Sequence, residues 1–130
     1  MNRREFLRLG AGLALASALP ARAAGRAGHV VIIGGGVGGA TAAKYLKLTN
    51  PALRVTVIEA NRTYIRGYGS SEVVTGHVAM DDLNVSYDAL KSRYGIEFVF
   101  DTVVGFDPDK KQVRTAGRQT LAYDKLIVSP

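Results

Sequence analysis

The stretch His29-Val-Val-Ile-Ile-Gly-Gly-Gly-Val-Gly-Gly39 decides the fold of this 130-residue chain. An apolar run typical of a buried strand leads without a break into glycines with the G-x-G-x-x-G spacing, at Gly34, Gly36 and Gly39. We expect Gly34 to allow a tight turn, Gly36 to let the backbone approach a pyrophosphate, and Gly39 to let a helix pack closely on the strand. The stretch therefore predicts a strand–turn–helix unit that binds a dinucleotide.

The residues that follow complete a βαβ unit. Helical sequence runs from Ala40 to Thr49, Asn50-Pro51 ends it, and a second β-type run from Arg54 to Ile58 leads to Glu59. Glu59 stands 20 positions after the last glycine, where an acidic side chain can accept a hydrogen bond from a ribose hydroxyl. The helix N-terminus would hold the phosphates. A purely structural turn without a ligand is the alternative, but the strand, helix, second strand and acid together favour dinucleotide binding.

The first 23 residues have the parts of a secretory signal peptide. A basic start containing Arg3-Arg4-Glu5-Phe6-Leu7 precedes an uncharged run from Leu9 to Leu19, and Ala21-Arg22-Ala23 supplies a small-x-small site. The run is too short to span a bilayer, which takes about 20 residues. A cytosolic amphipathic helix is the alternative, but the run lacks a polar face. The paired arginines ahead of Phe-Leu resemble the bacterial twin-arginine signal. We therefore expect the twin-arginine export machinery to deliver residues 24–130 to the periplasm.

Charge and cysteine content argue against a nucleic-acid site and against a metal centre. The chain carries a net charge of +6, but the signal region contributes +3 of it, which leaves residues 24–130 at +3. Their basic cluster, Lys110-Lys111 with Arg114, is expected to be a solvated hairpin rather than a nucleic-acid site, with docking of an acidic electron-transfer partner left open. The sequence has no cysteine, and His29 and His77 are too isolated to form a zinc site, so we expect no metal centre.

The fold class is α/β: the N-terminal part of a Rossmann-like domain with a parallel sheet, a βαβ unit and a β-hairpin. The further expected elements are a helix capped by Ser86 and ended by Gly95, a strand over Ile96–Phe100, a hairpin of Thr102–Phe106 with Gln112–Thr115, and a last strand over Leu121–Val128. The chain stops directly after that strand, whereas such a domain needs further strands. We therefore expect residues 24–130 to be an incomplete piece of a longer protein.

Several segments resemble the flavoprotein subunits of flavocytochrome c sulfide dehydrogenases. The strongest is Val30 to Lys47, in which Thr41-Ala-Ala-Lys-Tyr45 is more specific than the glycines. The resemblance continues through Val57–Asn61, Ser70–Val73, Tyr87–Leu90, Gly105–Lys111 and Tyr123–Pro130, and so covers nearly all of the chain after the signal. The wider group is the flavoprotein superfamily with two dinucleotide domains, which includes sulfide:quinone oxidoreductases and type II NADH dehydrogenases.

This resemblance implies an FAD-dependent enzyme of the periplasm that oxidises sulfide and passes electrons to a c-type cytochrome subunit. The FAD-binding residues that it implies are Gly34, Gly36, Val37, Gly38 and Gly39 at the pyrophosphate, Glu59 at the adenosine ribose, Val103 at the adenine, Ser129 near the flavin, and Ala60, which follows Glu59 in the sequence. Val103 would act through its backbone, and a plain core position in a strand is an equal alternative for it.

One departure from the family bears on how the cofactor is held. Gly67, in Gly67-Tyr-Gly-Ser-Ser-Glu-Val73, stands where the family has the cysteine that attaches the flavin. We therefore expect FAD to be bound without a covalent link, and the cysteines that take up sulfide to lie downstream. Two alternatives remain open: another FAD oxidoreductase of the superfamily, which uses a quinone or a nicotinamide, and a truncated chain without catalytic activity.

Overall fold

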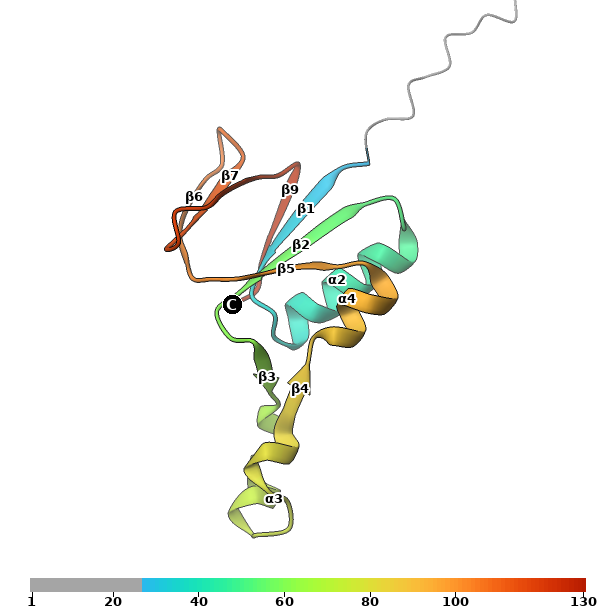
Figure 1. Cartoon of the computed structure of the whole chain (residues 1–130), viewed down its shortest axis with the longest axis vertical. Coiled ribbons are helices and arrows are strands. Elements are labelled where there is room, and N and C mark those ends of the chain that lie inside the picture. Colours follow the sequence, from blue (N-terminus) through green and yellow to red (C-terminus); the bar gives the residue numbers. More distant parts are fainter. Residues whose placement is uncertain (1–26) are drawn as a thin grey trace, which may run out of the picture.

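The computed structural model describes residues 27–130, so the expected export signal lies outside the described residues. Its centre is a four-stranded parallel sheet with the strand order β5-β2-β1-β9 (Figure 1). The four strands are β1 (His29–Ile33), β2 (Arg54–Glu59), β5 (Glu97–Phe100) and β9 (Lys125–Val128). Strand β1 lies between β2 and β9, so the first strand of the sequence is a central strand of the sheet.

Both faces of this sheet are covered, which explains why its strands read as continuous apolar runs. Helices α2 (Val37–Thr49) and α4 (Asp88–Tyr94) pack on one face, where Val30, Ile32 and Val57 form the core with Ala43. On the other face Val31 and Ile58 pack against a three-stranded antiparallel sheet. The strands of this second sheet are β6 (Val103–Asp107), β7 (Gln112–Thr115) and β8 (Thr120–Ala122).

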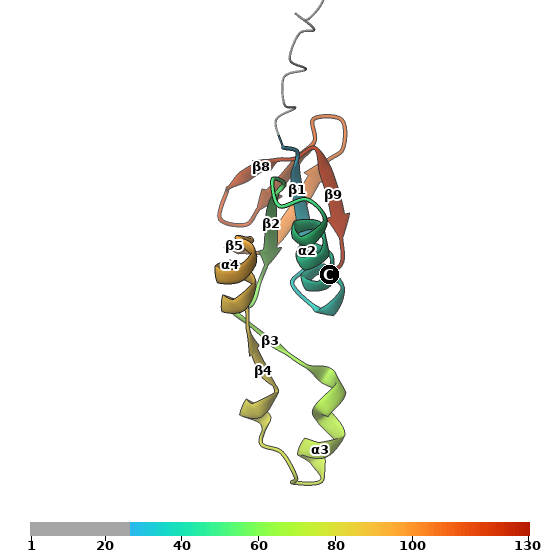
Figure 2. The same ribbon diagram turned by 90° about the vertical axis from the view of Figure 1, so that its right-hand side faces the viewer.

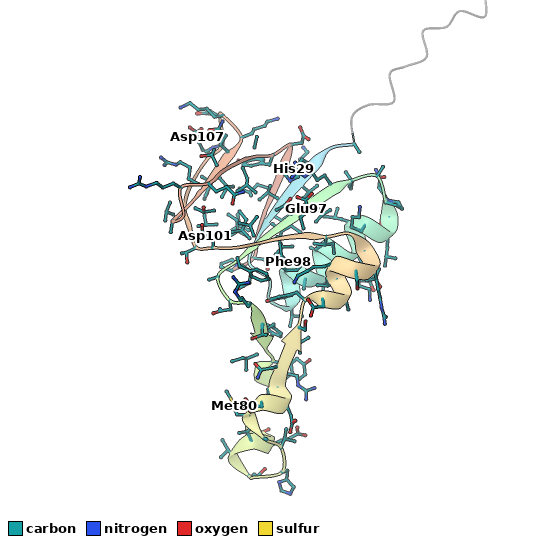
Figure 3. The ribbon with its side chains drawn as sticks, in the orientation of Figure 1. His29, Met80, Glu97, Phe98, Asp101 and Asp107 are labelled. Atoms are coloured by element: carbon teal, nitrogen blue, oxygen red, sulfur yellow. The ribbon has the colours of Figure 1, made fainter. Side chains whose placement is uncertain are left out.

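A long excursion, residues 63–86, leaves the carboxyl edge of the sheet and points away from it; we call it the arm (Figures 1 and 2). Its base is a two-stranded antiparallel ladder, and Met80 lies far out along it (Figure 3). The elements of the arm are β3 (Thr63–Ile65), the 3-10 helix η1 (Gly67–Gly69), α3 (Ser70–Val74), the 3-10 helix η2 (Met80–Leu83) and β4 (Asn84–Ser86). Leu83 is buried in the arm at 1% exposure.

The fold class predicted from the sequence is confirmed, including the βαβ unit and the hairpin of β6 and β7. Gly95 ends α4 with φ +62°, as expected for a left-handed cap. Helix α2 begins at Val37 rather than Ala40, because the glycines after Gly36 are already helical. The predicted cap of α4 was one residue early: Tyr87 is the N-cap, and the Ser86 hydroxyl accepts from the Asp88 amide at 3.1 Å.

The single last strand predicted over residues 121–128 is wrong. It is two strands in different sheets: Leu121 in β8 pairs with Val113, whereas Leu126 in β9 pairs with Val31. The chain changes sheets at Asp124, whose carboxylate accepts from the His29 amide at 2.6 Å and whose own amide donates to the His29 carbonyl at 2.8 Å. None of the helices formed by residues 27–130 is long and apolar enough to span a membrane.

Candidate dinucleotide-binding site

The glycine turn after β1 is shaped by contacts that exclude a side chain. Gly34 has φ +97°, and an added Cβ there would collide with the backbone carbonyl of Ser129. Its amide donates to the Ile58 carbonyl at 2.8 Å, which ties the turn to β2. An added Cβ on Gly39 would collide with the Gly34 carbonyl, so α2 can lie this close to the turn only with glycine at that position. These two glycines therefore set the approach of the helix to the sheet.

The N-terminus of α2 is open where a ligand would approach it. No side chain caps the helix, and within residues 27–130 the amides of Val37, Gly38 and Gly39 donate to no protein acceptor. An added Cβ on Gly36 would have Tyr64 as its nearest neighbour, with Cε2 at 3.9 Å. Unpaired amides and the positive end of the helix dipole favour an anion at this place. The residues present thus fit a phosphate group.

Glu59 ends β2 and is held in place by three protein donors. Its Oε2 atom accepts from the Gly35 amide at 2.6 Å. Its Oε1 atom accepts from the amide of Asn61 at 2.9 Å and from the Asn61 side chain at 3.3 Å. A carboxylate offers about four acceptor positions, so roughly one remains for a ligand hydroxyl. The carboxylate is fixed before a ligand arrives, which lowers the entropic cost of binding.

Two adjacent cavities meet at Glu59. The larger has a volume of about 640 Å³ and the smaller about 280 Å³, and Glu59 and Pro130 line both. The larger cavity extends from the glycine turn to Tyr64 and Tyr87, at the base of the arm. The smaller runs between the ends of β2 and β5 toward Val103. An elongated ligand with a hydroxyl-bearing centre therefore fits the site better than a compact one.

Six of the nine predicted site residues line these cavities: Gly34, Gly36, Val37, Glu59, Ala60 and Val103. Val103 also packs against the core of the second sheet, so its two alternative roles are compatible. Gly38, Gly39 and Ser129 line neither cavity. Ser129 instead supports the turn: its amide donates to the Ile33 carbonyl at 2.8 Å, and an added Cβ on Gly38 would lie 2.6 Å from its hydroxyl.

Sequence reasoning missed other residues of the site. Asn61, Arg62, Asp101 and Thr102 line the cavities because they follow the carboxyl ends of β2 and β5. That edge of a parallel sheet is where ligands bind, so strand ends alone pointed to these residues. Tyr87 is different: it opens the Tyr87–Leu90 segment of the family resemblance, but no motif marks it as a ligand-binding residue. Burial and the nearby Glu59 and Tyr64 raise its pKa to about 12.

The fold and this site together define a class of protein. Residues 28–130 match the pyridine nucleotide-disulphide oxidoreductase family, so the chain belongs to that family. It is similar to the sulfide-quinone reductase of Aquifex aeolicus (strain VF5), with 33% identity over 103 residues that make up 78% of this chain and 24% of that protein. The solved structure of the sulfide:quinone oxidoreductase from Aquifex aeolicus superposes with a TM-score of 0.73 and 31% identity, over 78% of this chain and 24% of that chain.

A shorter match bears on the resemblance to the flavocytochrome c sulfide dehydrogenases. The flavoprotein chain of the flavocytochrome c sulfide dehydrogenase of Chlorobaculum thiosulfatiphilum is 44% identical over 37 residues, which cover 28% of this chain and 77% of that sequence. This match supports the resemblance over part of the chain. The chain spans about a quarter of the length of the sulfide-quinone reductase, so the comparisons establish an oxidoreductase-family domain of Rossmann type.

Proposed function

We propose that residues 24–130 bind FAD without a covalent link, as the first dinucleotide-binding part of an exported oxidoreductase that acts on reduced sulfur compounds. The observation that carries the proposal is the position of Glu59. It stands where two cavities meet, fixed by the Gly35 amide and beside the open N-terminus of α2. This order of groups matches a ribose with a pyrophosphate on one side and an adenine on the other.

Each part of the site has a role toward FAD. The amides at the start of α2 hold the phosphates, and Glu59 accepts from the adenosine ribose. The smaller cavity takes the adenine, with Val103 at its wall. Bound FAD supplies the two-electron chemistry of the enzyme. Gly67 lies exposed on η1, and the 130 residues contain no cysteine, so this segment offers the flavin no thiol for attachment.

The proposed substrate and partner rest on the relatives. Both the sulfide-quinone reductase and the sulfide dehydrogenase are named for reduced sulfur. We propose sulfide as the electron donor and a c-type cytochrome subunit as the acceptor, following the flavocytochrome c relative. A quinone is the second candidate acceptor, because the longer match is to a sulfide-quinone reductase. Export by the twin-arginine route, which the Arg3-Arg4 pair supports, would bring this protein to the periplasm, the compartment proposed for the cytochrome subunit.

The test is a titration of the purified full-length protein with FAD, FMN and NADH, followed by anaerobic addition of sulfide. We expect FAD to bind most tightly and sulfide to bleach the absorbance of the bound flavin. Re-oxidation by added cytochrome c or by a soluble quinone then identifies the acceptor. Tighter binding of NADH than of FAD would contradict the cofactor assignment, and flavin that stays oxidised under excess sulfide would contradict the substrate assignment.

A further inference from the structure

Tyr87 is a buried aromatic residue whose hydroxyl is not needed for packing. It lies just before α4 with 3% of its surface exposed. Its ring stacks on Phe98 with centroids 4.6 Å apart and lies 6.2 Å from Phe100. Phe98 sits on β5 beside α4 (Figure 3). A phenylalanine would make these ring contacts equally well, so the hydroxyl calls for a separate explanation.

The hydroxyl of Tyr87 reaches the same glycine that Glu59 holds. An added Cβ on Gly35 would lie 2.8 Å from the Tyr87 hydroxyl oxygen and 3.1 Å from Glu59 Oε2. The two polar groups therefore flank Gly35 from α4 and from β2. Both residues also line the larger cavity. The absence of a side chain at Gly35 is what lets the hydroxyl and the carboxylate share this corner of the site.

Among the residues that the structure describes, this hydroxyl has no hydrogen-bond partner, and it is open to the cavity. Within residues 27–130 no hydrogen bond joins it to another group, and the causes of its raised pKa are burial and neighbouring acids rather than a hydrogen bond. The one fully enclosed side-chain polar atom without a partner in that range is Arg66 Nε, so the Tyr87 hydroxyl is not sealed off. A donor that faces the cavity without a protein partner in this range is free to donate to a bound ligand.

We propose that the Tyr87 hydroxyl donates a hydrogen bond to the adenosine diphosphate half of the bound dinucleotide, beside the ribose that Glu59 accepts from. The inference rests on the proposed function and adds a binding residue that lies outside the glycine motif. With a pKa of about 12, the phenol stays protonated across the working pH range and acts as a donor. A donor next to Glu59 also offsets the repulsion between its carboxylate and the phosphates.

The test is Tyr87→Phe in the full-length protein, titrated with FAD and separately with ADP. This variant keeps the ring stacking and removes only the hydroxyl. Loss of one hydrogen bond should weaken the binding of both probes by about 2- to 12-fold. Tyr94→Phe is the matched control, because Tyr94 is a partly buried tyrosine on the same helix that packs on the core away from Glu59. It should leave both affinities unchanged.

A second variant tests the same contact from the side of the glycine turn. Gly35→Ala places a methyl group against the hydroxyl, so it should weaken binding alone, and the two losses should combine to less than their sum in the double variant. Unchanged ADP affinity in Tyr87→Phe, or an equal loss in Tyr94→Phe, would overturn the inference. If the unaltered protein binds ADP but not FAD, the assignment of FAD as the cofactor fails. The effect of Tyr87→Phe on ADP affinity still decides whether the Tyr87 hydroxyl contacts the ligand.

Discussion

The carboxylate of Glu59 accepts a hydrogen bond from the amide of Gly35 at 2.6 Å, and this bond joins the end of β2 to the glycine turn after β1. The acid is therefore part of the glycine turn as well as a candidate ribose ligand. One oxygen of Glu59 accepts from the turn and the other from Asn61. A substitution at Glu59 should therefore disturb both the glycine turn and the candidate ribose contact.

We expect Glu59→Ala to weaken FAD affinity by about one to two decades, since a hydrogen bond to a charged group contributes roughly 1.5–3 kcal/mol. A fluorescence titration of the full-length protein measures the change. Glu72→Ala is the matched control, because Glu72 is an exposed acid of the arm that lines neither cavity. Equal affinities in the Glu59 and Glu72 variants would remove Glu59 from the site.

Alanine at Gly39 should destabilise the fold, whereas alanine at Gly36 should weaken FAD binding. Gly39→Ala forces a methyl group against the Gly34 carbonyl, so it should destabilise the fold by about 1–3 kcal/mol. Gly36→Ala meets only Tyr64 Cε2 at 3.9 Å, so stability should hold while the methyl group obstructs the phosphate site. Thermal unfolding and FAD titration of both variants separate the two effects. A Gly36 variant that binds FAD normally would show that the phosphates lie elsewhere.

We expect stability to fall with acid in two stages, from one polar network at the other end of the sheet. His29 Nε2 lies 2.8 Å from the Thr56 hydroxyl, which donates to Glu97 at 3.0 Å, and Arg54 donates to the same carboxylate at 2.9 Å. Burial, followed by the charge of Arg54, lowers the pKa of His29. The hydrogen bond from Arg54 is the main cause that lowers the pKa of Glu97.

For both His29 and Glu97, the lowered pKa makes the folded protein less stable as pH falls. A folded protein with a lowered His29 pKa resists the proton that the unfolded chain takes up, so stability falls as pH drops through the ordinary value of 6.5. The ionised Glu97 stabilises the fold above its ordinary value of 4.5 and loses that contribution as pH falls further. Urea unfolding across this range measures both stages. The pKa values of Asp88, Asp101 and Asp107 are lowered too, so Glu97→Gln should lessen the second stage without removing it, and an unchanged profile would contradict the role of Glu97.

FAD should leave the full-length protein on acid precipitation and appear in the supernatant. The reason is that Gly67 stands where the resemblance to the sulfide dehydrogenases implies the attaching cysteine, and the 130 residues contain no cysteine. Gly67→Cys is the converse variant, because it puts a thiol at this position. The substitution fits the structure, since an added Cβ there meets nothing within 4 Å. Flavin that stays in the pellet and maps to a peptide within residues 24–130 would contradict the prediction.

Export should depend on the identity of the paired arginines and not only on their charge. Changing Arg3 and Arg4 together to lysine keeps the charge but removes the pattern that the twin-arginine machinery reads. We expect the variant to be retained in the cytoplasm, as measured by cell fractionation. Arg8→Lys, later in the same region, is the control and should leave export intact. Normal periplasmic accumulation of the double variant would exclude this route.

The sequence predicted the parts of the fold that local rules control. The glycine spacing, the βαβ unit and the hairpin around Asp107 to Lys111 are set by turn chemistry and apolar runs, and the structure has all three. The division of residues 121–128 between two sheets escaped prediction, because Leu121 and Leu126 are both apolar and only tertiary pairing separates them. Tyr87 escaped for the same reason: its contact with the Gly35 corner joins segments that no motif connects.

The place of β9 beside β1 has a consequence for the order in which the molecule becomes competent. The wall of the Gly34 turn is the backbone of Ser129, which the ribosome adds long after the glycine motif has emerged. A nascent βαβ unit therefore carries the complete signature of a nucleotide site but not its shape. Under the proposed function, we expect capture of the cofactor to require that β9 has docked beside β1, so that binding would report the assembled sheet rather than the presence of the motif.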